Sequence, residues 1–203
     1  MKTQTKSTQE TITPEQALEI LKRGNDRFAQ NLKAQRDLQA QVIETSRGQY
    51  PFAAILSCID SRVPAELIFD QGIGDIFSVR IAGNIVNEDI LGSIEYSCKV
   101  AGAKVIVVVG HTKCGAVTAA CKDVKLGNIE KLLEKIKPAV NIIKKDNPTL
   151  DDDAIELVAI QNVHHSIQRI RHESPILADM EKSGSIHIAG SVYNVSTGVV
   201  TFL

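Results

Sequence analysis

Three short, almost wholly apolar runs restrict most strongly what this chain can fold into. Residues 105–109 read Val-Ile-Val-Val-Val and are followed by Gly110 and His111, whereas residues 52–56 are followed by Ser57 and Cys58. Residues 76–79 form the third run. Continuous runs of this length and type are typical of strands that are buried on both faces of a parallel sheet. Helical stretches lie between them, so the pattern predicts an α/β fold.

The rest of the chain extends this prediction to a mainly parallel central sheet flanked by helices. Residues 185–192 are expected to form a late strand, and residues 199–202 are expected to return after the turn at Thr197-Gly198 as an antiparallel edge strand. Helices are predicted at residues 64–69, 90–100, 114–122, 129–144 and 154–172.

The segment before the sheet is predicted to be an N-terminal helical arm. Residues 1–12 are polar and are expected to be flexible. A helix over residues 13–32 should then begin at Thr13, because Thr13 can cap it, Pro14 suits the first helical position and Gln16 can complete a capping box. Since this helix precedes the sheet, we expect it to pack on a partner subunit.

Length and composition favour a single soluble globular domain over the whole chain, residues 1–203. The chain has 23 Lys and Arg residues against 24 Asp and Glu residues, so nothing indicates a nucleic-acid or membrane partner. The N-terminus lacks the apolar segment of a signal peptide. Four cysteines in a chain of 203 residues without a secretion signal are expected to be reduced, which favours a cytoplasmic location.

The reactive residues follow two of the predicted strands. Cys58 comes directly after one strand, and His111 and Cys114 come directly after another. Because ligands of open α/β sheets bind at the carboxyl ends of the strands, we expect the three side chains to converge. Two thiolates and one imidazole suit Zn²⁺, and three protein ligands leave a fourth position open, as in catalytic sites. The sequence therefore predicts one catalytic zinc per chain.

An acid and a guanidinium lie beside the first of these ligands. Asp60 is expected either to accept a hydrogen bond from a water on the metal or to bind the metal itself, and Arg62 can hold its carboxylate with two hydrogen bonds. The remaining thiols and imidazoles have no such neighbours, so packing or surface roles are expected for Cys98, Cys121, His164, His165, His172 and His187.

At this level of detail the chain resembles the β-class carbonic anhydrases of bacterial type. The motif residues are Cys58, Asp60 and Arg62, followed by Gly110, His111, Cys114 and Gly115. Further similar segments are residues 65–66, 74–80, 82–84 and 93–96, so that the resemblance extends from about Thr13 to the end of the chain.

The resemblance implies a zinc ion on Cys58, His111 and Cys114, a catalytic dyad of Asp60 and Arg62, and a substrate pocket that uses Gln49, Phe77 and Tyr96. It also implies a homodimer, or a dimer of dimers, in which a partner completes that pocket. Two departures stand out. Position 81 is Ile where many relatives have Asn, and Ile55 occupies the position of a Trp that forms a noncatalytic bicarbonate pocket in one branch. Without that Trp, structural roles are expected for Arg80 and Tyr193.

The reaction that follows is the reversible hydration of CO₂ to bicarbonate and a proton, with hydroxide on the zinc as nucleophile. Hydrolysis of CS₂ or COS needs the same site and remains an alternative. A third reading is a zinc-dependent binding or regulatory protein without turnover, although such a protein would be free to lose a ligand or a dyad residue.

Overall fold

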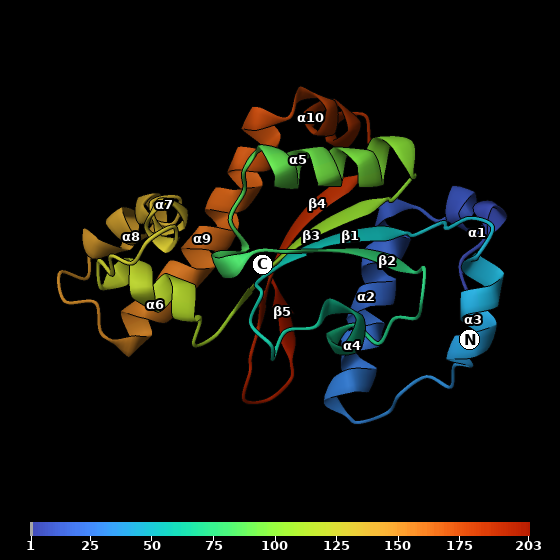
Figure 1. The fold of residues 1–203 in the computed structure, drawn as a ribbon, viewed down its shortest axis with the longest axis horizontal. Coiled ribbons are helices and arrows are strands. Elements are labelled where there is room, and N and C mark those ends of the chain that lie inside the picture. Colours follow the sequence, from blue (N-terminus) through green and yellow to red (C-terminus); the bar gives the residue numbers. More distant parts are fainter. Residues whose placement is uncertain (1) are drawn as a thin grey trace.

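The computed structural model describes residues 2–203 and is built around a five-stranded sheet in the order β2-β1-β3-β4-β5 (Figure 1). The strands are β1 (Ala53–Ser57), β2 (Ile76–Arg80), β3 (Val105–His111), β4 (His187–Tyr193) and β5 (Val200–Phe202). The first four strands are parallel and β5 is antiparallel to β4. The predicted fold class and the antiparallel edge strand are therefore confirmed.

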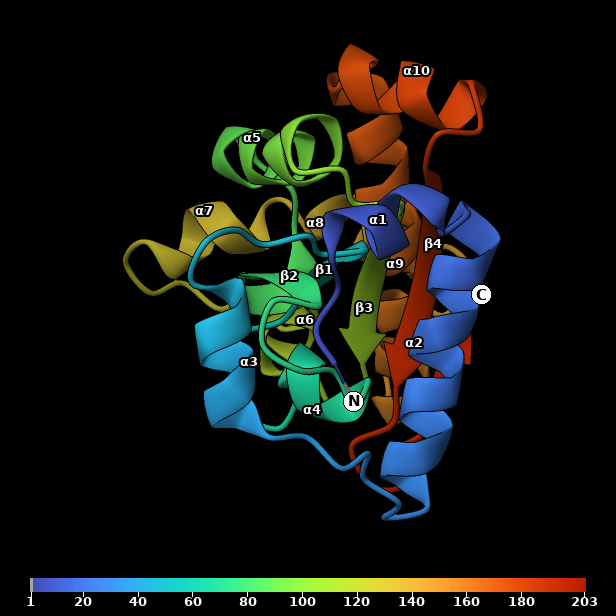
Figure 2. The same cartoon turned by 90° about the vertical axis from the view of Figure 1, so that its right-hand side faces the viewer.

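Helices cover both faces of the sheet (Figures 1 and 2). They are α1 (Lys6–Thr11), α2 (Pro14–Ala29), α3 (Leu38–Thr45), α4 (Ala65–Ile68), the 3₁₀ turn η1 (Ala82–Asn84), α5 (Glu88–Glu95), the π-helical turn η2 (Tyr96–Val100), α6 (Gly115–Cys121), α7 (Ile129–Leu133), α8 (Lys137–Lys144), α9 (Asp152–Glu173) and α10 (Pro175–Lys182). Among the described residues, no helix is long and apolar enough to cross a membrane.

The alternation of side chains along β1 and β3 divides the core into two layers. Ala54, Leu56, Ile106 and Val108 face α5, α9 and α10, whereas their neighbours along the same strands face α2 and α4. Every residue of β1 and β3 is buried, as predicted from their continuous apolar runs. A third cluster, formed by α6, α7, α8 and the first half of α9, lies beyond the end of the sheet and includes Cys58 and Cys114.

The N-terminal segment differs from the prediction. Residues 6–11 form helix α1 rather than a flexible coil, because Thr5 and Thr8 form a capping box and Gln9 donates hydrogen bonds to the carbonyls of Pro51 and Ala101. Met1 lies outside the described residues. Helix α2 begins at Pro14 with the predicted capping box. Its buried face, with Ala17 and Leu21, lies on the sheet of its own chain, so the predicted packing on a partner concerns only the opposite face.

Two other helical predictions need correction, and two helices lie outside the predicted ranges. Residues 129–144 form two helices rather than one, since Pro138 lacks an N–H and its ring disfavours a preceding helical turn. The predicted helix over residues 90–100 is α5 followed by the π turn η2. Helices α3 and α10 were not predicted, although Asp37 and Ser174 cap them with side-chain oxygens.

Candidate active site

The three predicted ligands meet at the carboxyl ends of β1 and β3. These strands are in parallel register, with Ser57 opposite Val109, so Cys58 and the end of β3 reach the same edge of the sheet. The Sγ atoms of Cys58 and Cys114 and a ring nitrogen of His111 all lie within 4.8 Å of one another, and all three residues are buried. The predicted convergence is confirmed, with one difference in detail, because His111 is the last residue of β3 rather than the first residue after it.

One imidazole nitrogen of His111 is left for a ligand. His111 Nδ1 lies 2.9 Å from the Thr112 carbonyl, which accepts a hydrogen bond from an Nδ1–H. Nε2 is buried and has no hydrogen-bond partner among the described residues. A buried nitrogen of this kind is rarely left unsatisfied, and a backbone carbonyl on the other nitrogen is the usual arrangement around a metal-binding histidine. The donor set of two sulfurs and one nitrogen therefore fits zinc.

A tight turn brings Cys114 back towards His111. Lys113 adopts a left-handed conformation with φ of 54°, and Cys114 then stands at the N-cap position of α6. The turn is attached to the end of the sheet, because the Thr112 N–H donates to the Tyr193 carbonyl at 3.0 Å. The chain therefore reverses within three residues and places an imidazole and a thiol on the same side.

The thiol of Cys58 lies in surroundings that favour its ionised form. A hydrogen bond from Cys114, together with a smaller effect of the neighbouring His111, lowers the pKa of Cys58 to about 4, against the effect of burial. The hydrogen bond to Cys58 and burial raise the pKa of Cys114, so the two thiols share a proton in the absence of metal. The Gly83 N–H also donates to Cys58 Sγ at 3.3 Å. Such thiolate character is what zinc ligation requires.

Asp60 and Arg62 form a bidentate pair beside this cluster. Arg62 Nε lies 2.9 Å from Asp60 Oδ1, and Arg62 Nη2 lies 2.7 Å from Oδ2. These hydrogen bonds hold the pKa of the Asp60 carboxyl well below its usual range, although partial burial opposes them. Asp60 Oδ2 also lies 4.0 Å from His111 Nε2. The acid is thus ionised, oriented and adjacent to the nitrogen that faces the predicted metal position.

Arg80 braces the loop that carries Cys58 and Asp60. Its Nε donates to the Cys58 carbonyl at 3.0 Å, and its Nη2 donates to the Asp60 carbonyl at 2.7 Å. Ile55 is fully buried in the layer under α2, where Tyr193 also packs. These contacts agree with the structural roles expected for Arg80 and Tyr193.

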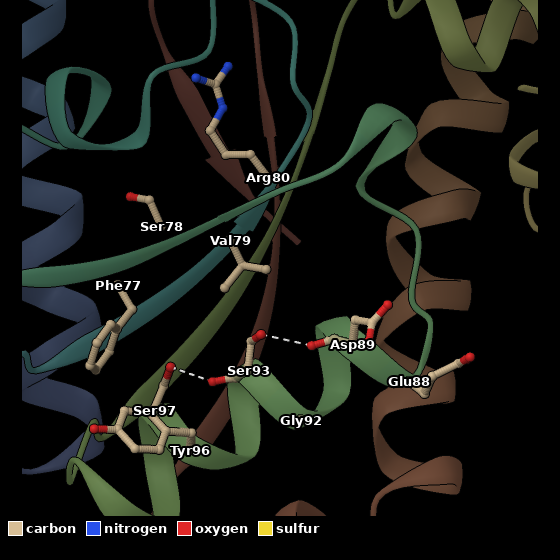
Figure 3. Close-up of a pocket in the computed structure, with 10 residues that line it drawn as sticks. All are labelled: Phe77, Ser78, Val79, Arg80, Glu88, Asp89, Gly92, Ser93, Tyr96 and Ser97. Atoms are coloured by element: carbon tan, nitrogen blue, oxygen red, sulfur yellow. Dashed lines mark hydrogen bonds between the residues drawn. The ribbon is translucent and has the colours of Figure 1, made fainter. Parts of the chain in front are cut away.

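Two of the three predicted substrate residues lie in one pocket. Phe77 and Tyr96 pack edge to face, with ring centroids 6.3 Å apart, at one end of a pocket of about 790 Å³ between β2 and α5 (Figure 3). Arg80, which braces the ligand loop, lies at the other end of this pocket (Figure 3). Gln49 does not line it and is exposed in the loop before β1. The structure therefore does not bring Gln49 to the other two residues within one chain.

The remaining thiols and imidazoles lie away from the cluster. Cys98 is in the core under α5 and α9, where burial raises the pKa of its thiol to about 12. Cys121 is the last residue of α6 and is not among the residues whose ligand atoms meet, and His164 and His187 line a separate hollow near β5. The sequence assigned no role to Lys113 or Glu156, whose hydrogen bond links α9 to the turn between His111 and Cys114. Gly83, which donates to Cys58 Sγ, belongs to residues 82–84, one of the segments of the resemblance.

Comparison with known proteins agrees with this geometry. The carbonic anhydrase family model matches residues 53–200. Carbonic anhydrase 2 of Mycobacterium tuberculosis is 35% identical over 194 residues, covering 91% of this chain and 90% of the relative. The carbonic anhydrase of Mycolicibacterium smegmatis is 34% identical over 194 residues and covers 92% of each chain. The structure of the Coccomyxa β-carbonic anhydrase superposes with a TM-score of 0.74 at 25% identity, covering 92% of this chain and 84% of that one. With its α/β sheet and its Cys-His-Cys cluster at the strand ends, this chain belongs to the β-class carbonic anhydrases.

Proposed function

We propose that this protein catalyses the reversible hydration of CO₂ to bicarbonate and a proton at one zinc ion per chain, held by Cys58, His111 and Cys114. The observation that carries the proposal is the buried cluster of two thiols and an unpartnered imidazole nitrogen next to the ionised Asp60. Bound there, zinc would lower the pKa of a coordinated water so that deprotonation occurs much closer to neutral pH.

The dyad supplies orientation rather than a covalent step. Asp60 remains ionised because Arg62 holds both carboxylate oxygens, so it can accept a hydrogen bond from the nucleophile and direct it towards the carbon of CO₂. Arg62 is itself held by the Lys113 carbonyl, which accepts from Nη2 at 3.2 Å. The geometry of the dyad is thus tied to the turn between His111 and Cys114.

Within the pocket between β2 and α5, the rings of Phe77 and Tyr96 offer an apolar surface to CO₂, which has little capacity for hydrogen bonds. In the proposed assembly, Gln49 of one subunit completes the pocket of another. A homodimer, or a dimer of dimers, is supported by the surface around β2, which is an edge strand. Leu38, Leu67 and Ile73 are 40% to 55% exposed there and line a hollow of about 520 Å³. Exposed apolar surface beside an unpaired strand is typical of an interface between subunits.

We also propose a cytoplasmic location, because the four cysteines are all free thiols and two of them must stay reduced to bind zinc. Hydrolysis of CS₂ or COS and metal-dependent regulation without turnover are not favoured. The dyad and the three ligand residues are all present, and the matching relatives are named carbonic anhydrases.

Zinc analysis and a stopped-flow assay test the proposal together. Wild-type protein should contain one zinc per chain and hydrate CO₂, and Cys58→Ser, His111→Ala and Cys114→Ser should each lose both properties. Cys121→Ser is a matched control, since this thiol lies away from the cluster. Full zinc occupancy in a ligand variant would remove that residue from the set. A wild-type preference for CS₂ in a parallel assay would favour the alternative hydrolase, and zinc without turnover would favour the regulatory reading.

A further inference from the structure

Helix α9 lies unusually close to the end of β3. A Cβ atom on Gly110 would come within 2.6 Å of Val163 Cγ2 and 3.5 Å of the Ala159 carbonyl oxygen, so only glycine fits at this crossing. Val163, Ala159 and Glu156 are spaced by four and three residues and therefore lie along one face of the helix. This face follows the chain as it leaves β3, and its next member, Glu156, reaches the turn between the two ligands.

Glu156 binds the backbone of that turn at the residue whose backbone conformation is least favourable. Lys113, between His111 and Cys114, has a φ of 54°, which is a costly conformation for a residue with a Cβ atom. The Lys113 N–H donates to Glu156 Oε1 at 2.8 Å, and the Lys113 carbonyl accepts from Arg62 Nη2 at 3.2 Å. A hydrogen bond to an ionised acceptor is stronger than one to a neutral group. The left-handed residue is therefore held through both of its backbone polar groups.

The same helix also supports η1, the turn that contacts the thiol of Cys58. Asn162 Nδ2 donates to the Gly83 carbonyl at 2.7 Å, and the Ser166 hydroxyl donates to the Asn84 carbonyl at 2.9 Å. The Gly83 N–H in turn donates to Cys58 Sγ. One helix face thus contacts the backbone beside Cys58 and the backbone between His111 and Cys114.

We propose that Glu156 is a positioning residue for the metal site. It has no direct contact with the ligand atoms, but it keeps the Lys113 peptide in the left-handed turn that aims Cys114 and His111 at one point. The inference rests on the zinc site proposed above and assigns to Glu156 a role in how firmly that zinc is held. Groups beyond the direct ligands commonly change metal affinity in this way.

The rate of zinc release to an excess of a chromophoric chelator measures this role independently of catalysis. Glu156→Ala should speed zinc release about tenfold or more, the range known for outer groups of metal sites. Glu156→Gln keeps an oxygen acceptor, so its rate of zinc release should rise much less. Asp153→Ala is the control, because it removes an exposed acid from the same helix that has no contact with the turn. In the cobalt-substituted proteins, the thiolate charge-transfer band should shift most in Glu156→Ala, less in Glu156→Gln and not in Asp153→Ala.

A second substitution separates the hydrogen bond from other effects. In a Lys113→Gly background, glycine adopts the left-handed turn without support. Glu156→Ala should therefore raise the rate of zinc release much less than it does in the wild-type background. This double variant also replaces Glu156→Ala if the single variant does not fold. Equal rates of zinc release from wild type, Glu156→Ala and Asp153→Ala would overturn the proposal. So would a rate of zinc release in Glu156→Gln as high as in Glu156→Ala. An increase in this rate on Glu156→Ala that is as large in the Lys113→Gly background as in wild type would overturn it too. Absence of zinc from the wild-type protein would instead overturn the proposed function itself.

Discussion

At the scale of single residues, the chemistry of the site depends on which neighbour holds each reactive atom. The Thr112 carbonyl engages His111 Nδ1 and leaves Nε2 for the metal, and Arg62 engages both oxygens of Asp60. Neither arrangement needs a distant part of the chain, since both partners lie within two residues of the group they hold. This explains why short motifs carry so much of the information about the reaction.

Replacement of Arg62 by alanine should suppress turnover while zinc remains bound. Asp60 then loses both side-chain hydrogen bonds and becomes free to ligate the metal, which removes the oriented acceptor. We expect CO₂ hydration to fall by about 100-fold or more, the range for loss of a positioned acid or base. Stopped-flow rates and zinc content measure the two effects. Arg23→Ala, which removes only an exposed pair with Glu19 on α2, should match wild type. Unchanged turnover in Arg62→Ala would exclude the dyad.

In the zinc-loaded protein near neutral pH, Asp60 should remain on Arg62 rather than bind zinc. The reason is that the ion pair satisfies the carboxylate, and that Ile55, buried in the core, has no indole N–H with which to form a noncatalytic bicarbonate pocket. Inhibition by bicarbonate should accordingly show no cooperativity. A crystal structure at neutral pH provides the test, and Asp60 directly on the metal would contradict the prediction.

At the scale of elements, segments distant in sequence are fixed by single buried polar side chains. Asp70, after α4, accepts hydrogen bonds from Arg27 at the end of α2 and from Arg36 in the following loop. Gln9 attaches α1 to the two loops that lead into β1 and β3. A polar N-terminal segment therefore becomes part of the folded domain, although its sequence resembles a flexible arm.

Gln9→Ala should lower the free energy of unfolding, since it leaves the Pro51 and Ala101 carbonyls without this donor. We expect a loss of about 1–2 kcal/mol, as is usual for two buried hydrogen bonds. Glu10→Ala, on the exposed side of the same helix, should change the free energy by less than about 0.5 kcal/mol. Denaturant unfolding measures both. Equal effects of the two substitutions would indicate that the arm is flexible after all.

Asp70→Asn should destabilise the protein and reduce the dependence of its stability on acid. Burial alone would raise the pKa of Asp70, but hydrogen bonds from Arg27 and Arg36 outweigh it and lower the pKa. The stability from this pair is thus fully present above the pKa of the unfolded chain and is lost as the pH falls through the lower folded pKa. Loss of one partner of a buried ion pair costs about 3 kcal/mol. Unfolding at neutral pH should show this difference, and at strongly acidic pH the two proteins should converge.

At the scale of the whole molecule, the surface beside β2 is where we propose that a second copy of the chain binds. Leu38, Leu67 and Ile73 are exposed around a hollow there, and Gln49 lies outside the pocket of Phe77 and Tyr96. In the proposed assembly, a second copy of the chain would cover the apolar surface and bring its own Gln49.

Leu67→Glu should therefore convert the protein to monomers and lower its activity. A carboxylate on this surface would have to be buried without a partner when two subunits associate. Leu157→Glu, at a similarly exposed position on α9, should leave the assembly intact. Sedimentation in the analytical ultracentrifuge distinguishes the outcomes. A fully active monomeric wild type would contradict the proposed assembly, and so would a Leu67→Glu variant of unchanged size.

Local sequence alone determined much of the fold and the chemistry. The continuous apolar runs predicted β1 and β3, because a fully apolar strand is stable only with both faces covered. The position of Cys58 and His111 at the ends of these runs predicted their convergence, because the ends of parallel strands meet at one edge. The break before α8 also has a local cause, because Pro138 lacks a backbone N–H.

Only the tertiary structure decided the contacts that cross between elements. Neither the hydrogen bond of Glu156 to Lys113 nor that of Gln9 to Pro51 has a local pattern, since 43 and 42 residues separate the partners. The packing of α2 is a similar case. Its apolar side chains indicate that one face of the helix is buried, but only the structure shows that this face lies on the sheet of its own chain. The periodicity of apolar residues along the sequence indicates which side chains are buried, whereas the residues that they contact depend on how the helices and strands pack together in space.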